Sequence, residues 1–210
     1  MVTPGNHEFG WNFAAYKARF FMPGNADSMY YSWRAGGVQF VALSTETEID
    51  TANVNKDNIE FAEKALSSVD RAQTPWVVAH FHRPLYCSSH DSCGKDATKL
   101  RKQVEDIFYK NRVDFTFSGH VHSYQRTTAV YQEKVEPGAP VYFMQGAGGN
   151  REGKQGPYPP PDQLPAWIAN SQVEFGVGLF TLSADQKSIS WQYIDAATGQ
   201  ALDEASYTRS

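Results

Sequence analysis

Apolar positions recur along the chain with two different periods, and each period predicts a type of element. Short alternating or continuous apolar runs, bounded by turn-forming residues, predict strands. The predicted strands are residues 29–33, 38–43, 75–81, 113–117, 141–144, 177–182 and 188–194. Apolar residues spaced three and four apart predict helices over residues 11–20, 57–69 and 100–108. Gly36-Gly37 joins the first two strands and is a hairpin signal.

The order of these elements changes about two thirds of the way along the chain. Strands alternate with helices up to about residue 138, whereas strands and loops follow from residue 139. A proline-rich stretch at 156–165 predicts an irregular excursion, and the last two predicted strands form a terminal hairpin. Alternation of strands and helices is typical of α/β proteins, to which the later segment adds antiparallel strands.

Composition places the chain among globular proteins. Its 210 residues, 41% of them hydrophobic and 14% aromatic, are enough for one domain with a substantial core. No apolar run approaches the roughly 20 residues that a membrane-spanning helix needs. The net charge of −4 argues against a nucleic-acid partner, which a basic surface would favour. A short basic cluster at residues 95–102 has helical spacing and indicates a solvated helix face.

The two cysteines, Cys87 and Cys93, lie on either side of a short polar stretch. A pair this close in sequence is compatible with a disulfide, which implies an oxidising compartment, or with two free thiols in a cytosolic protein. The chain has no Asn-x-Ser/Thr sequon, so one common mark of secretion is absent. We favour the disulfide.

Four of the six histidines occur in two strand-to-loop transitions. His80 and His82 end one predicted strand, and His120 and His122 follow Gly119 after another. In extended backbone, residues two apart share a face, so such a pair points into one site. Neutral imidazole is a common ligand for zinc, iron and related metals. A lone His-x-His is nevertheless more often ordinary polar packing than a ligand pair.

A third cluster of polar residues, Gly5-Asn6-His7-Glu8, lies near the start of the chain. Alone it is compatible with a plain turn capped by the asparagine. Three such clusters, each following an apolar strand, favour a shared site, because ligands of open α/β sheets bind beyond the carboxyl ends of strands. We therefore expect a metal centre at one edge of the sheet.

Three motifs in this order resemble a known family. GNHE (residues 5–8), HRPLYCSS (82–89) and GHVHSYQR (119–126) are similar to the last metal-site blocks of the calcineurin-like metallophosphoesterases, in particular their purple acid phosphatase branch. GNHE also occurs in protein Ser/Thr phosphatases, whereas the other two motifs are more specific. Residues 140–207, with a Gly-rich loop at 146–150, are similar to the C-terminal segment of the same branch.

The resemblance implies a fold, a division of the chain and an activity. The fold is α/β, part of a four-layer α/β/β/α sandwich with mixed sheets. Residues 1–138 are expected to be the C-terminal part of the metallophosphoesterase domain, and residues 139–210 a C-terminal segment packed on it. The implied activity is hydrolysis of phosphate monoesters of the acid phosphatase type, at a binuclear centre of iron with zinc, manganese or iron.

The resemblance also implies roles for individual residues. Asn6, His82 and His120 are similar to ligands of the divalent metal, and His122 to a ligand of the ferric metal. His7 matches a histidine that contacts the substrate and steadies the phosphate or assists the leaving group. His90 is placed where plant members have a substrate-side histidine, or is a solvated loop residue. 

Two nearby side chains have no direct role in the implied site. His80 matches no ligand position and is expected to be packed or to support a ligand from behind. Glu8 is expected to hold a ligand in place. Two metal ions about 3.5–4 Å apart bind phosphate oxygens and lower the pKa of a bridging water, and a histidine then protonates the departing alkoxide.

The anionic ligands that such a centre needs are not evident in the sequence. In the family they come from aspartate blocks preceding GNHE, together with a tyrosinate, but no acidic residue precedes Gly5 here. Asp114 lies at the start of a predicted strand, far from its ligand-bearing end. We therefore expect the chain to be the C-terminal portion of a longer enzyme and to be weak or inactive alone.

Other functions remain open at this stage. A phosphodiesterase or protein phosphatase of the same superfamily is one, and a non-catalytic, metal-depleted relative is another. The expected partner is a phosphate monoester substrate, with no nucleic acid and no membrane span, and the oligomeric state is undetermined. The cysteine pair and the resemblance together favour a secreted protein or one of a lysosome- or vacuole-like compartment.

Overall fold

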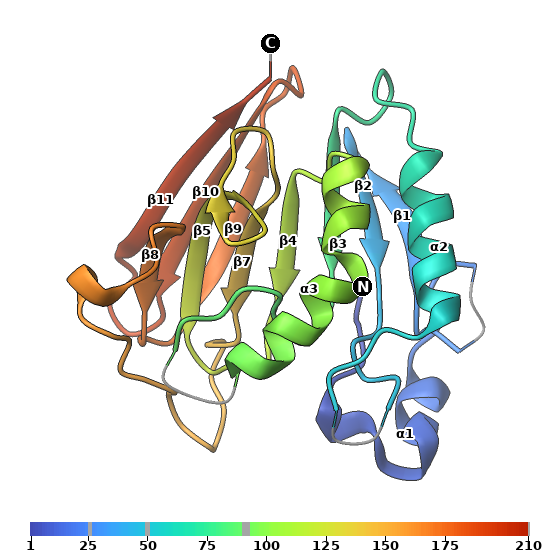
Figure 1. Ribbon diagram of the computed structural model, residues 1–210, viewed down its shortest axis with the longest axis horizontal. Helices are drawn as coiled ribbons and strands as arrows, with labels where there is room; N and C mark the ends of the chain where they lie inside the picture. The colour runs from blue at the N-terminus through green and yellow to red at the C-terminus, as the bar shows by residue number, and fades with distance from the viewer. Residues whose placement is uncertain (25–26, 49–50, 90–92, 210) are drawn as a thin grey trace.

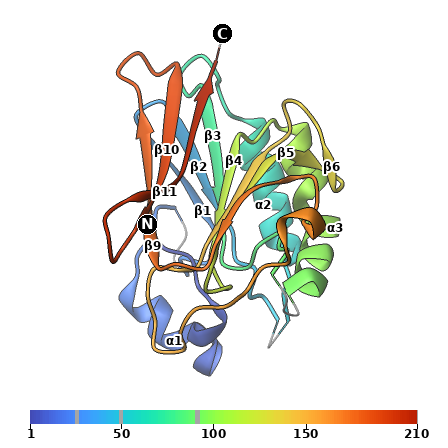
Figure 2. The same ribbon diagram turned by 90° about the vertical axis from the view of Figure 1, so that its left-hand side faces the viewer.

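Two β-sheets packed face to face form the centre of the molecule, and two helices cover the outer face of the larger sheet (Figures 1 and 2). The computed structural model describes residues 1–24, 27–48, 51–89 and 93–209. The mixed α/β fold class expected from the sequence is thereby confirmed, and the helix, sheet and sheet layers are three of the four expected layers. None of the described helices has the length and apolar character needed to cross a bilayer.

The bounds of the elements are as follows. The strands are β1 (Tyr31–Ala35), β2 (Val38–Ala42), β3 (Trp76–His80), β4 (Phe115–Ser118), β5 (Tyr124–Tyr131), β6 (Lys134–Val135), β7 (Val141–Gln145), β8 (Ile168–Gln172), β9 (Gly176–Leu182), β10 (Ser188–Asp195) and β11 (Ala201–Thr208). The helices are α1 (Gly10–Arg19), α2 (Lys56–Ser67) and α3 (Cys93–Lys110), with 3-10 turns η1 (Asn6–Glu8) and η2 (Pro161–Gln163).

The large sheet has the strand order β1-β2-β3-β4-β7-β5-β6, with β8 added on β5. Strands β2, β3, β4 and β7 run parallel to their neighbours in this series, whereas β1 and β5 are antiparallel additions. Helices α2 and α3 lie in the crossover connections that parallel pairing requires. Because the four central strands are parallel, their carboxyl ends meet at one edge of the sheet, and the loops after them are neighbours.

Strand β3 shows why this sheet is central to the fold. Val77 and Ala79 pack in the core under α2 and α3, whereas Trp76 and Val78 pack in the core between the two sheets. All four side chains are at most 3% exposed. A strand covered on both faces needs a continuous apolar run, which is the pattern that predicted this strand.

The second sheet, β11-β10-β9, is joined to the first by a buried polar network as well as by apolar packing. Arg126 of β5 donates to both carboxylate oxygens of Asp203 on β11, at 2.6 and 2.8 Å. Tyr124 of β5 donates to the same carboxylate at 2.5 Å and accepts from the indole N–H of Trp191 at 2.8 Å. The charged pair therefore bridges the two sheets with its hydrogen-bonding groups satisfied.

The structure departs from the sequence predictions in three places. The regular part of the first helix begins later than expected, because Trp11, Asn12 and Phe13 have φ of 54°, 55° and 60°. The predicted terminal hairpin forms as β9 and β10, and β11, which was not predicted, adds a third strand by pairing with β10. Strands β5, β6 and β8 were not predicted at all. The division at residues 138 and 139 stays a prediction.

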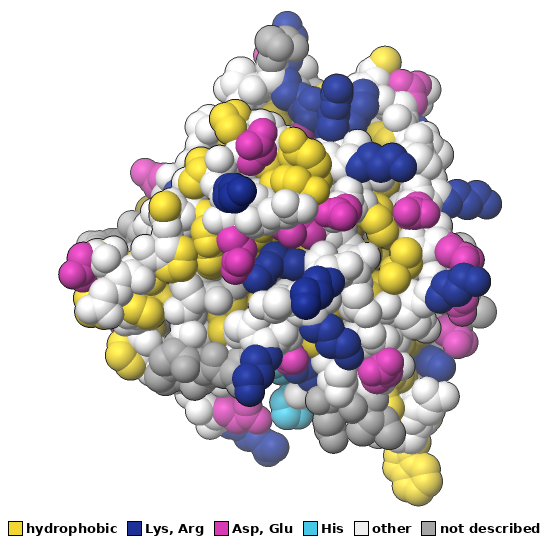
Figure 3. Space-filling model, viewed as in Figure 1, with side chains coloured by type: hydrophobic (Ala, Val, Ile, Leu, Met, Phe, Trp, Pro, Cys, Tyr) yellow, Lys and Arg dark blue, Asp and Glu magenta, His cyan; other side chains and the backbone are white. Residues whose placement is uncertain are grey.

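Charged side chains are interspersed over the face of the molecule that carries α2 and α3 (Figure 3). Lys95 and Lys102 of the basic cluster on α3 are exposed there. Asp96 and Asp106 lie on the same helix, so the basic residues are mixed with acidic ones. This agrees with a solvated helix face.

Candidate metal centre

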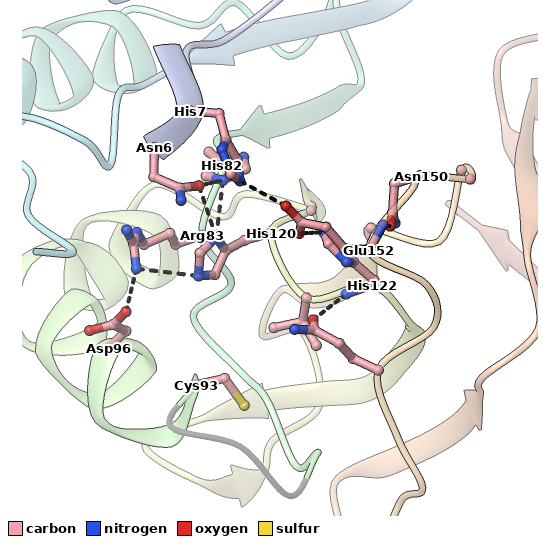
Figure 4. A pocket seen from close by; sticks show the side chains of 16 residues that line it. Asn6, His7, His82, Arg83, Cys93, Asp96, His120, His122, Asn150 and Glu152 are labelled. Atoms are coloured by element: carbon pink, nitrogen blue, oxygen red, sulfur yellow. Dashed lines mark hydrogen bonds and ion pairs between the residues drawn. The ribbon is translucent and has the colours of Figure 1, made fainter. Parts of the chain in front are cut away.

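The loops after the parallel strands surround a polar pocket at the edge of the large sheet (Figure 4). The loop after β3 contributes His82 and Arg83, and the loop after β4 contributes His120 and His122. The loop after β7 contributes Glu152, and η1 contributes Asn6. The loops after β3, β4 and β7 thus converge because these strands are parallel neighbours, and η1 packs against them.

Three donor atoms meet in this pocket. Asn6 Oδ1 lies 2.8 Å from His82 Nε2 and 3.3 Å from His120 Nδ1, and the two imidazole nitrogens are 3.1 Å apart. Ligand atoms bound at about 2.1 Å to one ion, at angles between 90° and the tetrahedral angle, are about 3.0–3.4 Å apart. Two of the three separations lie in this range and the third, 2.8 Å, is just below it, so two imidazole nitrogens and one amide oxygen fit a single divalent transition-metal ion.

Geometry at Asn6 depends on a close approach of the chain to His82. A Cβ on Gly5 would lie 2.8 Å from Cε1 of His82, so a larger residue there would push the ring away. Glu8 Oε2 accepts a hydrogen bond from the Gly5 amide at 2.8 Å. Glu8 therefore supports the turn that carries Asn6. In the described structure it contacts the backbone of this turn and not the Asn6 side chain itself.

Burial keeps both imidazoles of the group neutral. It lowers the pKa of His82 to about 3, and the neighbouring His120 and Arg83 lower it further. Burial, followed by the Arg83 guanidinium, lowers the pKa of His120 to about 4. Only neutral imidazole has a lone pair for a metal, so both rings are competent ligands even at moderately acidic pH.

A buried ion-pair network lies behind His120. Arg83, 7% exposed, donates through Nε to Glu46 Oε1 at 2.8 Å and through Nη1 to Asp96 Oδ2 at 2.6 Å. Nη1 also lies 3.3 Å from Nε2 of His120. Glu46 follows β2, so the loops after three adjacent parallel strands are tied together by one guanidinium.

His122 lies on a different side of the pocket from the three-atom group. Gln155 holds the backbone of His122 by two hydrogen bonds. The backbone N–H of His122 donates to Gln155 Oε1 at 2.7 Å, and the backbone N–H of Gln155 donates to the His122 carbonyl at 3.0 Å. His122 Nε2 lies 3.8 Å from Glu152 Oε2, and His7 Nε2 lies 3.9 Å from Glu152 Oε1. Glu152 thus stands between these two histidines.

Several functional candidates were missed by the sequence reasoning. Asp96, Glu152 and Gln155 carry no motif of their own, and only the tertiary structure brings them to the pocket; Glu46 lies behind it, bound to Arg83. Within the part of the chain that the structure describes, no three His, Cys, Asp or Glu side chains are grouped as a metal site. The convergent group contains two histidines and an asparagine.

The remaining predicted residues are placed as follows. His80 packs edge-on against Trp33 and Tyr31, with ring centroids 5.2 and 6.1 Å away, so it is a packed residue. His90 lies outside the described residues. Cys87 and Cys93 form a disulfide, which confirms that prediction.

The loops after parallel strands bring imidazole side chains beside the amide of Asn6 at one edge of the sheet of an α/β protein, and comparisons with known proteins identify the family. The family model of the calcineurin-like phosphoesterases matches residues 1–124. The model described as iron/zinc purple acid phosphatase-like protein C matches residues 139–204. The chain belongs to the calcineurin-like phosphoesterase family, and its C-terminal segment to the purple acid phosphatase branch.

Individual relatives point the same way. The chain is 37% identical over 190 residues to the probable purple acid phosphatase 20 of Arabidopsis thaliana, covering 85% of this chain and 43% of that protein. It is 30% identical over 234 residues to acid phosphatase type 7 of Danio rerio, covering 97% and 52%. The structure of the purple acid phosphatase PPD1 from yellow lupin matches all of this chain and 40% of that one, with a TM-score of 0.85 and 25% identity. The chain spans about half or less of the length of these relatives.

Proposed function

We propose that Asn6, His82 and His120 hold one divalent cation and that His122 supplies a ligand to a second metal beside it. The convergence of the three donor atoms at 2.8–3.3 Å carries this proposal. Family membership supports a binuclear centre, with iron as one metal and zinc, manganese or iron as the other. The neutral imidazoles favour such borderline transition-metal ions over magnesium or calcium, which prefer oxygen ligands.

The proposed activity is hydrolysis of phosphate monoesters. A bound metal pair polarises phosphate oxygens and lowers the pKa of bound water. His7, whose side chain is 71% exposed, stands at the pocket mouth within reach of a bound phosphate. We assign it the contact to the substrate and the transfer of a proton from Nε2 to the leaving alkoxide. His90 is kept as a second substrate-side candidate.

Charge balance limits what these residues achieve by themselves. Two metal ions carry at least four positive charges, and the proposed ligands in the described structure are all neutral. Among the described residues, the carboxylate of Glu152 lies 3.8 Å from Nε2 of His122, and a single carboxylate does not balance the charge of two metal ions. We therefore propose that the 210 residues alone bind one divalent ion and turn over phosphate monoesters weakly.

Metal analysis combined with turnover tests the proposal. We expect the chain to take up about one equivalent of Zn²⁺ or Mn²⁺ and to hydrolyse p-nitrophenyl phosphate slowly at acidic pH. His120→Ala should lose the bound metal, and turnover with it. His80→Ala, at a packed histidine outside the pocket, is the matched control and should keep the metal.

Three outcomes would contradict parts of the proposal. Wild-type metal content in His120→Ala would refute the ligand assignment. Faster cleavage of bis(p-nitrophenyl) phosphate than of the monoester would favour the phosphodiesterase alternative. Full acid phosphatase activity in the 210-residue chain would show that additional carboxylates are not needed.

We also propose that the protein works in an oxidising compartment, as a secreted protein or in a lysosome- or vacuole-like one. The Cys87–Cys93 disulfide supports this, because cytosolic thiols are normally kept reduced. Alkylation and mass measurement of protein recovered from its own cells should find both cysteines oxidised. Recovery of free thiols from freshly lysed cells would contradict the assignment.

A further inference from the structure

The side chains behind His120 form a group of three charged residues, Arg83, Glu46 and Asp96. Arg83 and Glu46 are 7% and 1% exposed, and Asp96 completes a set with two carboxylates and one guanidinium. Figure 4 shows Arg83 between Asp96 and His120. Buried ionic groups are costly unless each is paired and hydrogen-bonded. These are paired, and among the described residues the side chain of Arg83 also reaches the imidazole of His120.

The direction of the hydrogen bond at His120 Nε2 follows from the chemistry of its partner. A guanidinium has only donors, so the contact from Arg83 Nη1 at 3.3 Å makes Nε2 the acceptor. A neutral imidazole has one N–H and one lone pair. The ring proton of His120 is therefore on Nδ1 in this arrangement, facing Asn6 and His82.

That tautomer is the wrong one for a metal ligand at Nδ1. An ion bound there takes the Nδ1 lone pair, so the ring loses its Nδ1 proton to solvent and gains one at Nε2, with no change in its net charge. The new Nε2–H then faces an Arg83 N–H, and it needs an acceptor. Metal-bound histidines generally donate their second N–H to a carboxylate, a carbonyl or water.

Asp96 is better placed than Glu46 to supply this acceptor. Glu46 Oε1 already accepts from Arg83 and from Thr45, and Oε2 accepts from Arg83 at 3.1 Å. In the described structure Asp96 uses only Oδ2, on the same Nη1 that touches His120. Its side chain is 33% exposed, against 2% for Glu46, so it has room to reorient.

We propose that Asp96 is a positioning residue for the metal ligand His120: its carboxylate accepts a hydrogen bond from Nε2–H of His120 when Nδ1 binds the ion, and Arg83, anchored on Glu46, donates to Nε2 when Nδ1 binds no ion. This inference rests on the metal position proposed above. It assigns Arg83, in the loop after β3, and Asp96, in the first turn of α3, a shared role that the sequence motifs do not indicate.

Calorimetric titration of the 210-residue chain with Zn²⁺ tests the inference. Asp96→Ala should weaken Zn²⁺ binding by about 10-fold or more, the usual effect of losing such a partner. Asp106→Ala is the matched control, because Asp106 is an exposed residue of the same helix that contacts Tyr131. The Zn²⁺ affinity of Asp106→Ala should stay within about twofold of that of the wild type. Circular dichroism confirms that both variants are folded.

A spectroscopic measurement separates positioning from a general structural effect. In the Zn²⁺-loaded wild type, NMR should show a slowly exchanging Nε2–H proton on His120, and metal-free protein should show the Nδ1–H tautomer. Asp96→Ala should lose the Nε2–H signal. Asp96→Asn retains a carbonyl oxygen, so it should keep that signal and recover most of the affinity.

The possible failures are distinguishable. Wild-type Zn²⁺ affinity in Asp96→Ala, or weakened binding with an unchanged Nε2–H signal, overturns this inference and leaves the metal site intact. If the wild-type chain binds no Zn²⁺, or binds it equally well as His120→Ala, both this inference and the proposed metal position fall.

Discussion

At the scale of single residues, His120 combines a proposed ligand with an unfavourable backbone conformation. Its φ is 66°, in the left-handed region that costs a non-glycine residue about 1 kcal/mol or more. The turn is held by amide hydrogen bonds from Gly119 to His82 and from Val121 to Gly119, both at 2.8 Å. Strain at a ligand persists only where its surroundings determine it, and here the neighbouring loop does so.

Gly146 is part of those surroundings, and its substitution is the sharpest test of them. A Cβ at this position would lie 2.0 Å from the carbonyl oxygen of Val121, which is backbone and has no room to yield. We expect Gly146→Ala to destabilise the fold by about 1–3 kcal/mol and to weaken Zn²⁺ binding. Gly148→Ala is the control, since nothing lies within 4 Å of a Cβ there. Chemical denaturation and titration measure both, and equal behaviour of the two variants would contradict the steric argument.

Buried histidines make the stability of the fold depend on pH. Burial lowers the pKa of His82 to about 3 and that of His80 to about 4, below the value of about 6.5 in the unfolded chain. Between the folded-state and unfolded-state pKa values, the unfolded chain binds more protons than the folded chain. The stability that comes from the neutral histidines is therefore complete above pH 6.5 and is lost as the pH falls toward 3–4. We expect the free energy of unfolding of the metal-free chain to decrease over that range.

His80→Leu isolates one contribution to this pH dependence. The variant removes a buried ring whose Nε2 has no hydrogen-bond partner among the described residues. Urea denaturation between pH 7 and 4 should then show a shallower loss of stability than in the wild type, by up to about 1.4 kcal/mol per pH unit. Parallel pH curves for the two proteins would contradict the prediction.

At the scale of elements, the disulfide joins the loop after β3 to the first residue of α3. Cys87 and Cys93 are six residues apart, and Asp96 lies one helical turn further on. Closing so short a loop limits the unfolded chain and stabilises the fold by roughly 2 kcal/mol in the loop-entropy model. The disulfide therefore also fixes the helix start that carries Asp96.

We expect the double variant Cys87→Ser, Cys93→Ser to lose roughly 2 kcal/mol of stability. Reducing the wild type with dithiothreitol should give the same loss. Reductant should have no effect on the double variant, because the chain has only these two cysteines. Thermal denaturation under each condition measures the effect, and an unchanged midpoint in the variant would show that α3 is anchored without the bond.

At the scale of the whole molecule, the two sheets depend on each other through the Arg126–Asp203 pair. The two side chains are 13% and 4% exposed. The Asp203 carboxylate also holds the Tyr124 hydroxyl, and that hydroxyl holds Trp191. The network passes from β5 in the large sheet to β10 and β11 in the small one. Removal of one member leaves buried partners without a counterpart.

Asp203→Ala should therefore cost about 3 kcal/mol or more, since breaking a buried pair leaves an uncompensated charge. Glu204→Ala, at the next residue of β11, is the control, because Glu204 is exposed and contacts only Gln192 among the described residues. It should stay within about 0.5 kcal/mol of the wild type. Denaturant midpoints compare them, and similar losses in both variants would show that the pair does not join the sheets.

The comparison between sequence and structure differs from element to element. Strand β3 was predicted because burial on both faces requires a continuous apolar run, a local signal. Strand β11 was missed because only part of its surface is covered, so Asp203, Glu204 and Ser206 interrupt the apolar pattern. Its pairing with β10 depends on contacts that the local pattern does not contain. The first turn of α1 was misplaced because left-handed backbone leaves no mark in hydrophobic spacing.

By itself, the sequence determined the α/β class, the main strands, the family and the proposed metal ligands, because periodicity and motifs are properties of short stretches of chain. Only the tertiary structure decided that Asn6, His82 and His120 bring their donor atoms within 2.8–3.3 Å. It also decided that Asp96, Glu152 and Gln155 line the same pocket and that Glu46 lies behind it against Arg83. The physical reason is that parallel strand order and loop packing set these distances, and both depend on residues far apart along the chain.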